Sequence, residues 1–328
     1  MVLLGVALLA LAVVASLCVG SRDVPPAEVW HALVAAGPTS PDASWAYAVV
    51  REQRVPRTVL ALLVGAALGV AGAVMQSLTR NPLADPGILG VNAGAALAVV
   101  LAVALTGFVG IWFSLWFAFA GAALAVVLVH LLGTAGGAAR TPVRLALGGV
   151  AVSAAASSLV QTVILADQEA FNEFRFWAAG SLEGRRWEVV GAVAPFVAAG
   201  LLLALAVASG LNALALGDDV GRSLGVRAAR LRAATTVAVA LLCGAATAAV
   251  GPVGFVGLAV PVMVRALVGT DMRWVLPLVA LYAPGLLLLA DVVGRRVVPG
   301  SEVQVGIVTA ILGGPVFVVL VRRARGTW

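Results

Sequence analysis

Stretches of about 20 apolar residues without a charged side chain recur from one end of the sequence to the other. A hydrocarbon core roughly 30 Å thick requires a stretch of this length for each helical crossing. Charged residues make up 11% of the chain, whereas a soluble domain carries about 25%, and this difference excludes a soluble globular protein. The sequence therefore predicts an all-α integral membrane protein with one transmembrane domain over residues 1–328.

Charged residues, prolines and glycines divide the chain into about ten predicted transmembrane helices. These are residues 2–20, 57–78, 87–107, 110–133, 143–166, 188–208, 230–250, 252–269, 274–293 and 303–321. The first stretch resembles a secretion signal, but it lacks a basic start, so we interpret it as a transmembrane helix. The stretch 252–269 is short and rich in glycine and proline, which oppose a regular helix.

An even number of crossings places both termini on one side, and the arginines near the C-terminus assign that side to the cytoplasm. The group Arg51, Arg54 and Arg57 then faces outward, against the positive-inside tendency. Either these side chains extend to the interface beside acids such as Glu52, or a partner outside requires positive charge. The arginines are scattered singly among loops rather than striped along one face, so no nucleic-acid partner is indicated.

Motifs for catalysis or metal binding are missing from the sequence. The two cysteines, Cys18 and Cys243, lie in apolar runs, and only two histidines are present. No catalytic residue and no metal site are therefore predicted. Asp291 is the main ionisable residue within a predicted span, and it is the candidate coupling residue for an ion-driven secondary transporter. An intramembrane enzyme is a second rival interpretation.

A six-residue pattern, Leu-Leu-x-Gly-Ala-Ala, occurs at residues 62–67 and again at 241–246. Gly72 and Gly251 follow the two copies at the same spacing. Since the copies fall on predicted spans that run in opposite directions, the pattern fits an inverted internal repeat of the kind found in transporters. Chance similarity between helices rich in alanine and glycine is the alternative.

Several longer motifs follow one another along nearly the whole chain. They are Arg-Val-Pro-Arg-Thr at 54–58, Gln76, Asn-Pro-Leu-Ala-Asp-Pro-Gly-Ile-Leu-Gly at 81–90, Leu-Ala-Leu-Gly at 214–217, Gly-Pro-Val-Gly-Phe-Val-Gly-Leu at 251–258, Leu-Ala-Asp at 289–291 and Gly-Ile-Val-Thr-Ala at 306–310. In this order they resemble the FecCD permease family, the membrane subunits of type II ABC importers for iron siderophores, haem and cobalamin. The resemblance implies the permease fold of those importers and a role in substrate import rather than an enzyme activity.

The resemblance also implies four sets of functional residues. Docking of a substrate-binding protein is expected at Arg54, Arg57 and Arg295, and the outer mouth of the pathway at Asp167 and Gln168. A cytoplasmic gate is expected at Asn81, Leu83, Thr141 and Pro142. Coupling to the ATPase is expected in the segment 211–227, at Leu214, Leu216, Gly217, Asp218, Gly221, Leu224 and Gly225. The chain has Gly221 and Val262 where the family commonly has alanine and histidine.

The partners implied by the resemblance are two ATPase subunits, a second permease copy or paralogue, and a periplasmic or lipid-anchored substrate-binding protein, all at a bacterial cytoplasmic (inner) membrane and its lipid. The chain itself is expected to bind no cofactor, because ATP and Mg²⁺ belong to the ATPase subunits. A homodimer and a heterodimer both remain open. So does the cargo, for which an iron siderophore, haem and a cobalamin-like cofactor are the candidates.

Overall fold

The computed structural model describes residues 1–328 except 21–23, 36, 38–43, 135–141, 299 and 325–328, and all regular elements in the described residues are helices. Their bounds are α1 Val2–Cys18, α2 Pro26–Val34, α3 Ser44–Ala48, the π-helix η1 Val49–Arg54, α4 Val55–Thr79, the 3₁₀ helix η2 Pro86–Leu89, α5 Val91–Thr106, α6 Ile111–Thr134, α7 Pro142–Ala166, α8 Gln168–Ala178, α9 Trp187–Ala215, α10 Asp218–Ser223, α11 Ala228–Val250, α12 Val256–Val268, α13 Met272–Val297 and α14 Val305–Ala324. The predicted all-α class is confirmed.

Each of the ten predicted spans corresponds to an apolar helix in the described part of the chain. Six helical stretches are long and apolar enough to cross a membrane, namely Ser44–Thr79, Ile111–Gly133, Ala146–Ala166, Trp187–Ala215, Ala228–Val250 and Met272–Val297. Val2–Cys18, Val91–Thr106, Val256–Val268 and Val305–Val319 are apolar but shorter. The stretch 252–269 becomes helical only at Val256, because Gly251 and Phe255 both have positive φ and Pro252 has no backbone N–H.

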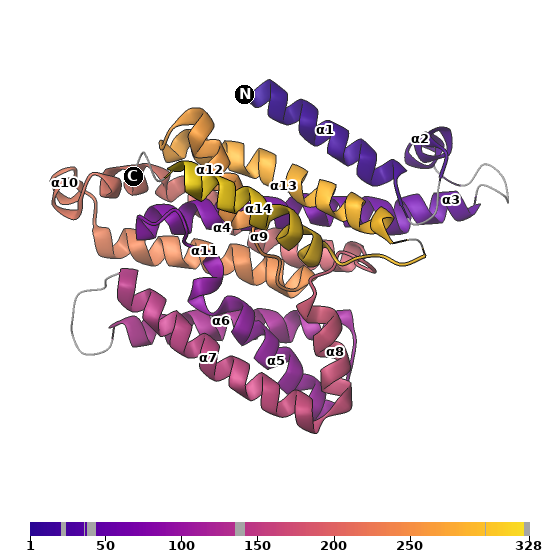
Figure 1. Ribbon diagram of the computed structural model, residues 1–328, viewed down its shortest axis with the longest axis horizontal. Coiled ribbons are helices and arrows are strands. Elements are labelled where there is room, and N and C mark those ends of the chain that lie inside the picture. Colours follow the sequence, from indigo (N-terminus) through magenta and orange to yellow (C-terminus); the bar gives the residue numbers. More distant parts are fainter. Residues whose placement is uncertain (21–23, 36, 38–43, 135–141, 299, 325–328) are drawn as a thin grey trace.

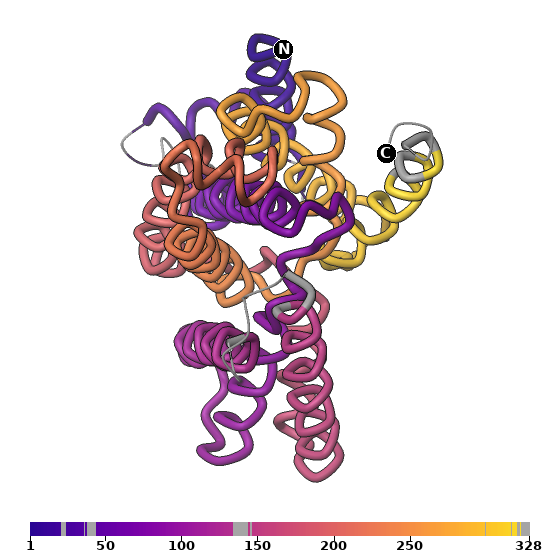
Figure 2. Tube along the Cα trace, turned by 90° about the vertical axis from the view of Figure 1, so that its left-hand side faces the viewer, coloured from indigo at the N-terminus to yellow at the C-terminus, as the bar shows by residue number. Residues whose placement is uncertain are grey.

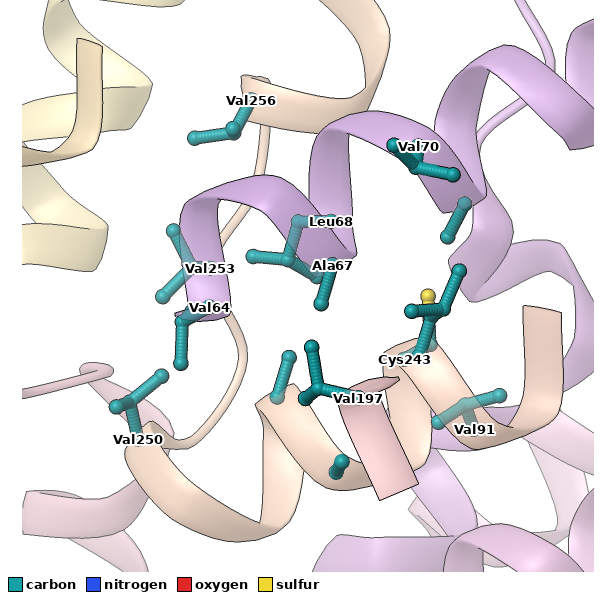
Figure 3. Close-up of a cluster of buried hydrophobic side chains, with 14 of the residues drawn as sticks. Val64, Ala67, Leu68, Val70, Val91, Val197, Cys243, Val250, Val253 and Val256 are labelled. Atoms are coloured by element: carbon teal, nitrogen blue, oxygen red, sulfur yellow. The ribbon is translucent and has the colours of Figure 1, made fainter. Parts of the chain in front are cut away.

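Helix α4 is at the centre of the bundle and is almost entirely buried. It packs against α13, α11, α12 and α9 (Figure 1). Helices α5, α6, α7 and α8 form a second group below it, and Figure 2 shows this group extending away from the rest of the bundle. Small and β-branched side chains such as Val64, Ala67 and Val250 fill the space between the central helices (Figure 3).

Two glycines permit close backbone contacts, one between α4 and α12 and the other between α7 and the loop of residues 80–90. A Cβ atom added at Gly72 of α4 would lie 1.7 Å from the carbonyl oxygen of Gly257 in α12. A Cβ atom added at Gly149 of α7 would lie 1.6 Å from the carbonyl oxygen of Ile88. Only a residue without a side chain allows such approaches. The loop is therefore held against α7 by direct backbone packing.

The bundle has two ends, which we name after one residue at each. The Arg57 end includes the C-termini of α1 and α13 and the N-terminus of α4, which Arg57 and Arg295 connect. The Asp218 end includes α10 and the C-terminus of α4, since Arg80 and Arg232 both bind Asp218. Helices α4 and α11 therefore run in opposite directions while packing together. This is the arrangement that an inverted repeat requires, and the repeat itself stays a prediction.

Candidate functional site

A cluster of four charged side chains lies at the Arg57 end. The Arg57 Nη2 atom is 2.6 Å from Asp291 Oδ1, and its Nη1 atom is 2.7 Å from Glu302 Oε2. Arg295, one helical turn after Asp291, donates to the other oxygen of the same carboxylate. Asp291 is thus held between two guanidinium groups, and its bond to Arg57 joins α13 to α4. The bond between Arg57 and Glu302 joins α4 to the segment that precedes α14. We call these four residues the outer ion cluster.

Arginines at this end also satisfy the free carbonyl groups at the C-termini of two short helices. Arg54 donates to the carbonyl oxygens of Leu17 and Cys18 at the end of α1, and Arg295 donates to those of Ser16 and Val19. Arg51 donates to three carbonyl oxygens at the end of α2. Cations are stabilised at helix C-termini because the last carbonyls have no partner within the helix. The arginines that the sequence predicts to face outward therefore have a structural use that the sequence did not reveal.

The residues predicted for docking, Arg54, Arg57 and Arg295, are brought together at this end, but their side chains are largely buried and bonded internally. Their role in docking stays a prediction. Asp291, the residue on which a secondary transporter would depend, is bonded to both Arg57 and Arg295. A carboxylate with two arginine partners is poorly suited to binding and releasing a coupling ion, which weighs against that rival.

A second ion cluster lies at the Asp218 end. Asp218 accepts from Arg80 at 2.8 Å and from Arg232 at 2.5 Å, and Arg80 also donates to the carbonyl oxygen of Leu214 at 2.5 Å. We call Arg80, Asp218 and Arg232 the inner ion cluster. Partial burial raises the pKa of Asp218, but the hydrogen bond and charge of Arg232, with the charge of Arg80, outweigh it and lower the pKa below its usual 3.8. Sequence reasoning missed Arg80 and Arg232.

The predicted coupling residues surround α10. Leu216, Val220 and Leu224 are exposed, whereas Leu214 and Gly221 are buried against one another. Positive φ angles at Gly217 and Gly225 allow the chain to turn sharply before and after the short helix. The result is a protruding helix with an apolar exposed surface at the end of the bundle.

The predicted gate residues Asn81 and Leu83 are exposed and lie directly after α4. The Asn81 Oδ1 atom accepts from the Leu83 backbone N–H at 2.9 Å, which fixes the turn. Arg80, whose φ of 51° is left-handed, ends α4 and connects this turn to Asp218. Thr141 lies outside the described residues, and Pro142 is the first residue of α7. The structure therefore joins part of the predicted gate to the coupling segment through Arg80.

Of the two residues predicted for the outer mouth, Asp167 has a structural role. Its Oδ1 atom accepts from the backbone N–H of Ala170 at 2.7 Å, so it caps the N-terminus of α8. Gln168 is exposed beside Asn172. Helix α8 ends at Ala178, because Gly180 has a positive φ and the chain then turns toward α9.

A buried polar contact also joins α12 to α4. Arg265 donates to the side-chain oxygen of Gln76, and its Nη2 atom lies 2.9 Å from the carbonyl oxygen of Ala73. The Gln76 amide in turn donates to the carbonyl oxygen of Leu258 at 3.2 Å. Gln76 is one of the sequence motifs, but its pairing with Arg265 was not predicted, since the two residues are far apart along the chain. The contact lies beside the approach of Gly72 to Gly257 and holds the two helices in register.

Comparison with known proteins gives consistent matches over almost the entire chain. The sequence model of the FecCD transport family matches residues 8–323 of this chain. The ferric enterobactin transport system permease protein FepD of Escherichia coli K12 is 46% identical over 317 residues, which cover 96% of this chain and 93% of that protein. The hemin transport system permease protein HmuU of Yersinia pestis is 37% identical over 277 residues, covering 83% and 82%.

The fold has a counterpart among solved structures. A chain described as an inward-facing conformation of a metal-chelate type ABC transporter superposes with a TM-score of 0.85 and 29% sequence identity. The superposition covers 98% of this chain and 99% of the other. The shared architecture therefore includes all the helices that build the two ion clusters.

Proposed function

Because the chain belongs to the FecCD transport family, the membrane permeases of ATP-binding cassette importers, we propose that it carries an iron chelate of the siderophore type into the cytoplasm. It is a multi-pass protein of the bacterial inner membrane, with apolar helices of spanning length. The 46% identity to a ferric enterobactin permease over nearly the full chain is the observation that carries the choice of cargo. Haem is the second candidate, by the similarity to HmuU.

The Asp218 end is the proposed docking site for an ATPase subunit, so that the two permeases of the assembly bind two ATPase subunits. The exposed apolar residues Leu216, Val220 and Leu224 on and beside α10 form a surface that a groove in a partner can bury. ATP and Mg²⁺ are bound by those subunits, and this chain contributes no catalytic site. ATP binding acts by stabilising one of two conformations of the pathway more than the other. The inner ion cluster then transmits the movement of α10 to the turn at Asn81.

A second permease, either a copy or a paralogue, is the proposed neighbour in the membrane. Helix α7 exposes large apolar side chains such as Leu147, Val150 and Leu159 along its length. Most of the helix is uncovered within the single chain. A dimer would bury part of this face and place the substrate pathway along its axis.

Docking of a substrate-binding protein is proposed at the Arg57 end. Arg57 is the best placed of the three predicted arginines, because its partner Glu302 lies in a loop and retains 15% exposure. A carboxylate on the binding protein can replace Glu302 while Asp291 continues to hold the guanidinium group. Charge pairs of this kind contribute to orientation and association rate and weaken with salt.

The proposed function is tested by purifying the tagged chain from its native membrane in mild detergent and identifying its stoichiometric partners by mass. We expect an equimolar ATP-binding subunit and one or two permease species. The purified assembly, reconstituted in vesicles with its binding protein, is then expected to import radiolabelled iron as a ferric siderophore only when ATP is present. A lone chain that transports without an ATPase would overturn the proposal.

A further inference from the structure

A cavity of about 460 Å³ lies at the Arg57 end, where α6 and α8 meet the end of α11, and several polar side chains interrupt its mostly apolar lining. Its lining includes Ser114, Glu173, Trp177, Arg185 and Gln304. Helix α8 connects the α5–α7 group to the central helices at this point (Figure 1). The volume falls within the roughly 300–1,000 Å³ that is typical of sites for small molecules. None of the residues predicted for docking, the gate, the outer mouth or ATPase coupling lines this cavity.

Arg185 is the unusual residue of this cavity. Its Nε atom is shielded from solvent and has no hydrogen-bond partner among the described residues. The residue as a whole is half-buried, and no described carboxylate forms an ion pair with it. Burial lowers the pKa of Arg185 to about 10, while the negative charge of Glu173 partly opposes the shift. The side chain therefore stays charged at neutral pH. A half-buried guanidinium group without a carboxylate partner is available to an anionic ligand, and charged groups with shifted pKa values in a cavity are candidates for binding sites.

Trp177 provides a second, independent observation. The residue is only 6% exposed, and its indole N–H has no acceptor among the described residues. Buried indole groups usually have a hydrogen-bond partner. Two donor side chains without acceptors thus line one cavity, which is the pattern expected where an acceptor group binds.

The cavity also contains hydrogen-bond acceptors, and two of them are negatively charged carboxylates. Glu173 Oε1 accepts from the Ser114 hydroxyl group at 3.0 Å, which leaves capacity for further donors. Glu183, the other acid of the lining, is exposed to solvent. The cavity therefore offers a cation and an indole N–H to an anionic oxygen, and two carboxylates to N–H or O–H groups.

We propose that this cavity is a binding site for an oxygen-rich chelate, in which Arg185 binds an anionic oxygen and Glu173 accepts a hydrogen bond from an N–H or O–H group of the same ligand. This inference rests on the proposed function, because an iron chelate supplies both kinds of group. It makes Arg185 a specificity-determining residue that favours anionic over uncharged chelates.

The test measures equilibrium binding of two probes, radiolabelled ferric citrate and ferric enterobactin, without binding protein or ATP. The chain is used with the subunits that co-purify with it, in nanodiscs of phosphatidylcholine. The variants are Arg185→Gln and, as a matched control, Arg186→Gln, which removes the neighbouring exposed arginine outside the cavity. Arg185→Gln is expected to weaken binding by on the order of 10- to 100-fold, since the lost bond involves a charged group. Arg186→Gln is expected to bind as the unmodified protein does.

Thermal unfolding separates a binding role from a structural one. Because Arg185 has no direct partner among the described residues, Arg185→Gln is expected to leave the unfolding temperature unchanged or raised. A clear decrease would assign Arg185 a structural role and overturn the inference. So would the absence of binding of both probes to the unmodified protein at millimolar concentration, or binding that Arg185→Gln leaves intact.

Two further outcomes distinguish this inference from its alternatives. If Arg185→Gln removes a co-purifying anionic phospholipid and leaves probe binding unchanged, the anion is a lipid phosphate and the chelate assignment is wrong. If the unmodified assembly imports ferric enterobactin with ATP while Arg185→Gln does not alter binding, the cavity inference fails and the proposed function stands. Failure of the unmodified assembly to import any iron chelate would instead refute the proposed function.

Discussion

The two ion clusters differ in how far they are removed from solvent. In the outer ion cluster the side chains of Arg57, Asp291, Arg295 and Glu302 are between 2% and 15% exposed. In the inner ion cluster those of Arg80, Asp218 and Arg232 are between 21% and 49% exposed. Both clusters join helices that are far apart in sequence. The difference therefore lies in their environment rather than in the kind of contact.

Burial determines what each cluster can do. Breaking a buried ion pair leaves an uncompensated charge and is strongly unfavourable, whereas an exposed pair can exchange its partner for water at little cost. The outer ion cluster is thus suited to holding α1, α4 and α13 in a fixed arrangement. The inner ion cluster is suited to a region that changes conformation during transport. Four predictions test this contrast.

The largest effect is expected for Asp291→Asn. The change leaves Arg57 and Arg295 close together without their shared carboxylate, so we expect a loss of about 3–5 kcal/mol of stability. The loss of stability is measured as a lower folded yield in size-exclusion chromatography and a lower unfolding temperature in detergent. Glu302→Gln is the control, since it retains the Asp291 bridge. Equal stability of Asp291→Asn and the unmodified protein would show that the outer ion cluster does not hold the helices together.

The next effect is expected for Asp218→Asn, and it concerns transport rather than folding. An exposed cluster contributes only about 0.2–1 kcal/mol, so the unfolding temperature should change little. We expect severalfold less iron imported per ATP hydrolysed, because α10 loses its connection to Arg80. The matched control is Asp219→Asn on the same short helix. Asp219 is exposed, and its one ion pair with a described residue is to Arg222 at 3.6 Å. An equal loss in both variants would contradict a specific role for Asp218.

A smaller effect is expected for Glu302→Gln at the Arg57 end. Arg57 keeps Asp291 but loses the negative charge of its second partner, and its guanidinium group becomes more available to a carboxylate of the binding protein. We expect binding of that protein to tighten by a few-fold at low salt and the gain to shrink as salt is added. Surface plasmon resonance on the reconstituted assembly measures both. Unchanged affinity at every salt concentration would mean that Arg57 does not take part in docking.

The smallest effect is expected from pH. Because the folded-state pKa of Asp218 is lowered, its contribution is fully present above the usual value of 3.8 and is lost as the pH falls through the lower folded value. The stability difference between the unmodified protein and Asp218→Asn should therefore be constant from about pH 5 to 8. Thermal unfolding of both proteins across this range checks it. A difference that changes near neutral pH would indicate another titrating group.

The sequence predicted the fold class and the helices because both depend on local properties. Runs of apolar residues of spanning length define the helices, and the motifs at 54–58, 81–90 and 251–258 indicate the family. The helices α2 and α3 were missed since they are short and lie between the first two predicted spans. The start of α12 was placed too early because the conformation at Phe255 depends on packing against Gly313 of α14.

Among the candidate site residues, the sequence determined which ones are charged or polar, and it predicted a side of the membrane for each. It identified Arg54, Arg57 and Arg295 as a group, and Asp218 as part of the coupling segment. It did not show that Arg54 and Arg295 bond to the end of α1, or that Arg80 reaches Asp218. These partners are separated by 36 or more positions along the chain, and no local pattern relates them.

The tertiary structure alone decided which charges are paired and which are not. Asp291 is the main ionisable residue predicted within a span, and the packing of α4 against α13 gives it two arginine partners. In the sequence, Arg185 looks like any other loop arginine. Folding places it, half-buried, in the lining of a cavity, without a direct partner among the described residues. Charge is a property of a residue type, whereas compensation of that charge depends on which helices meet around it.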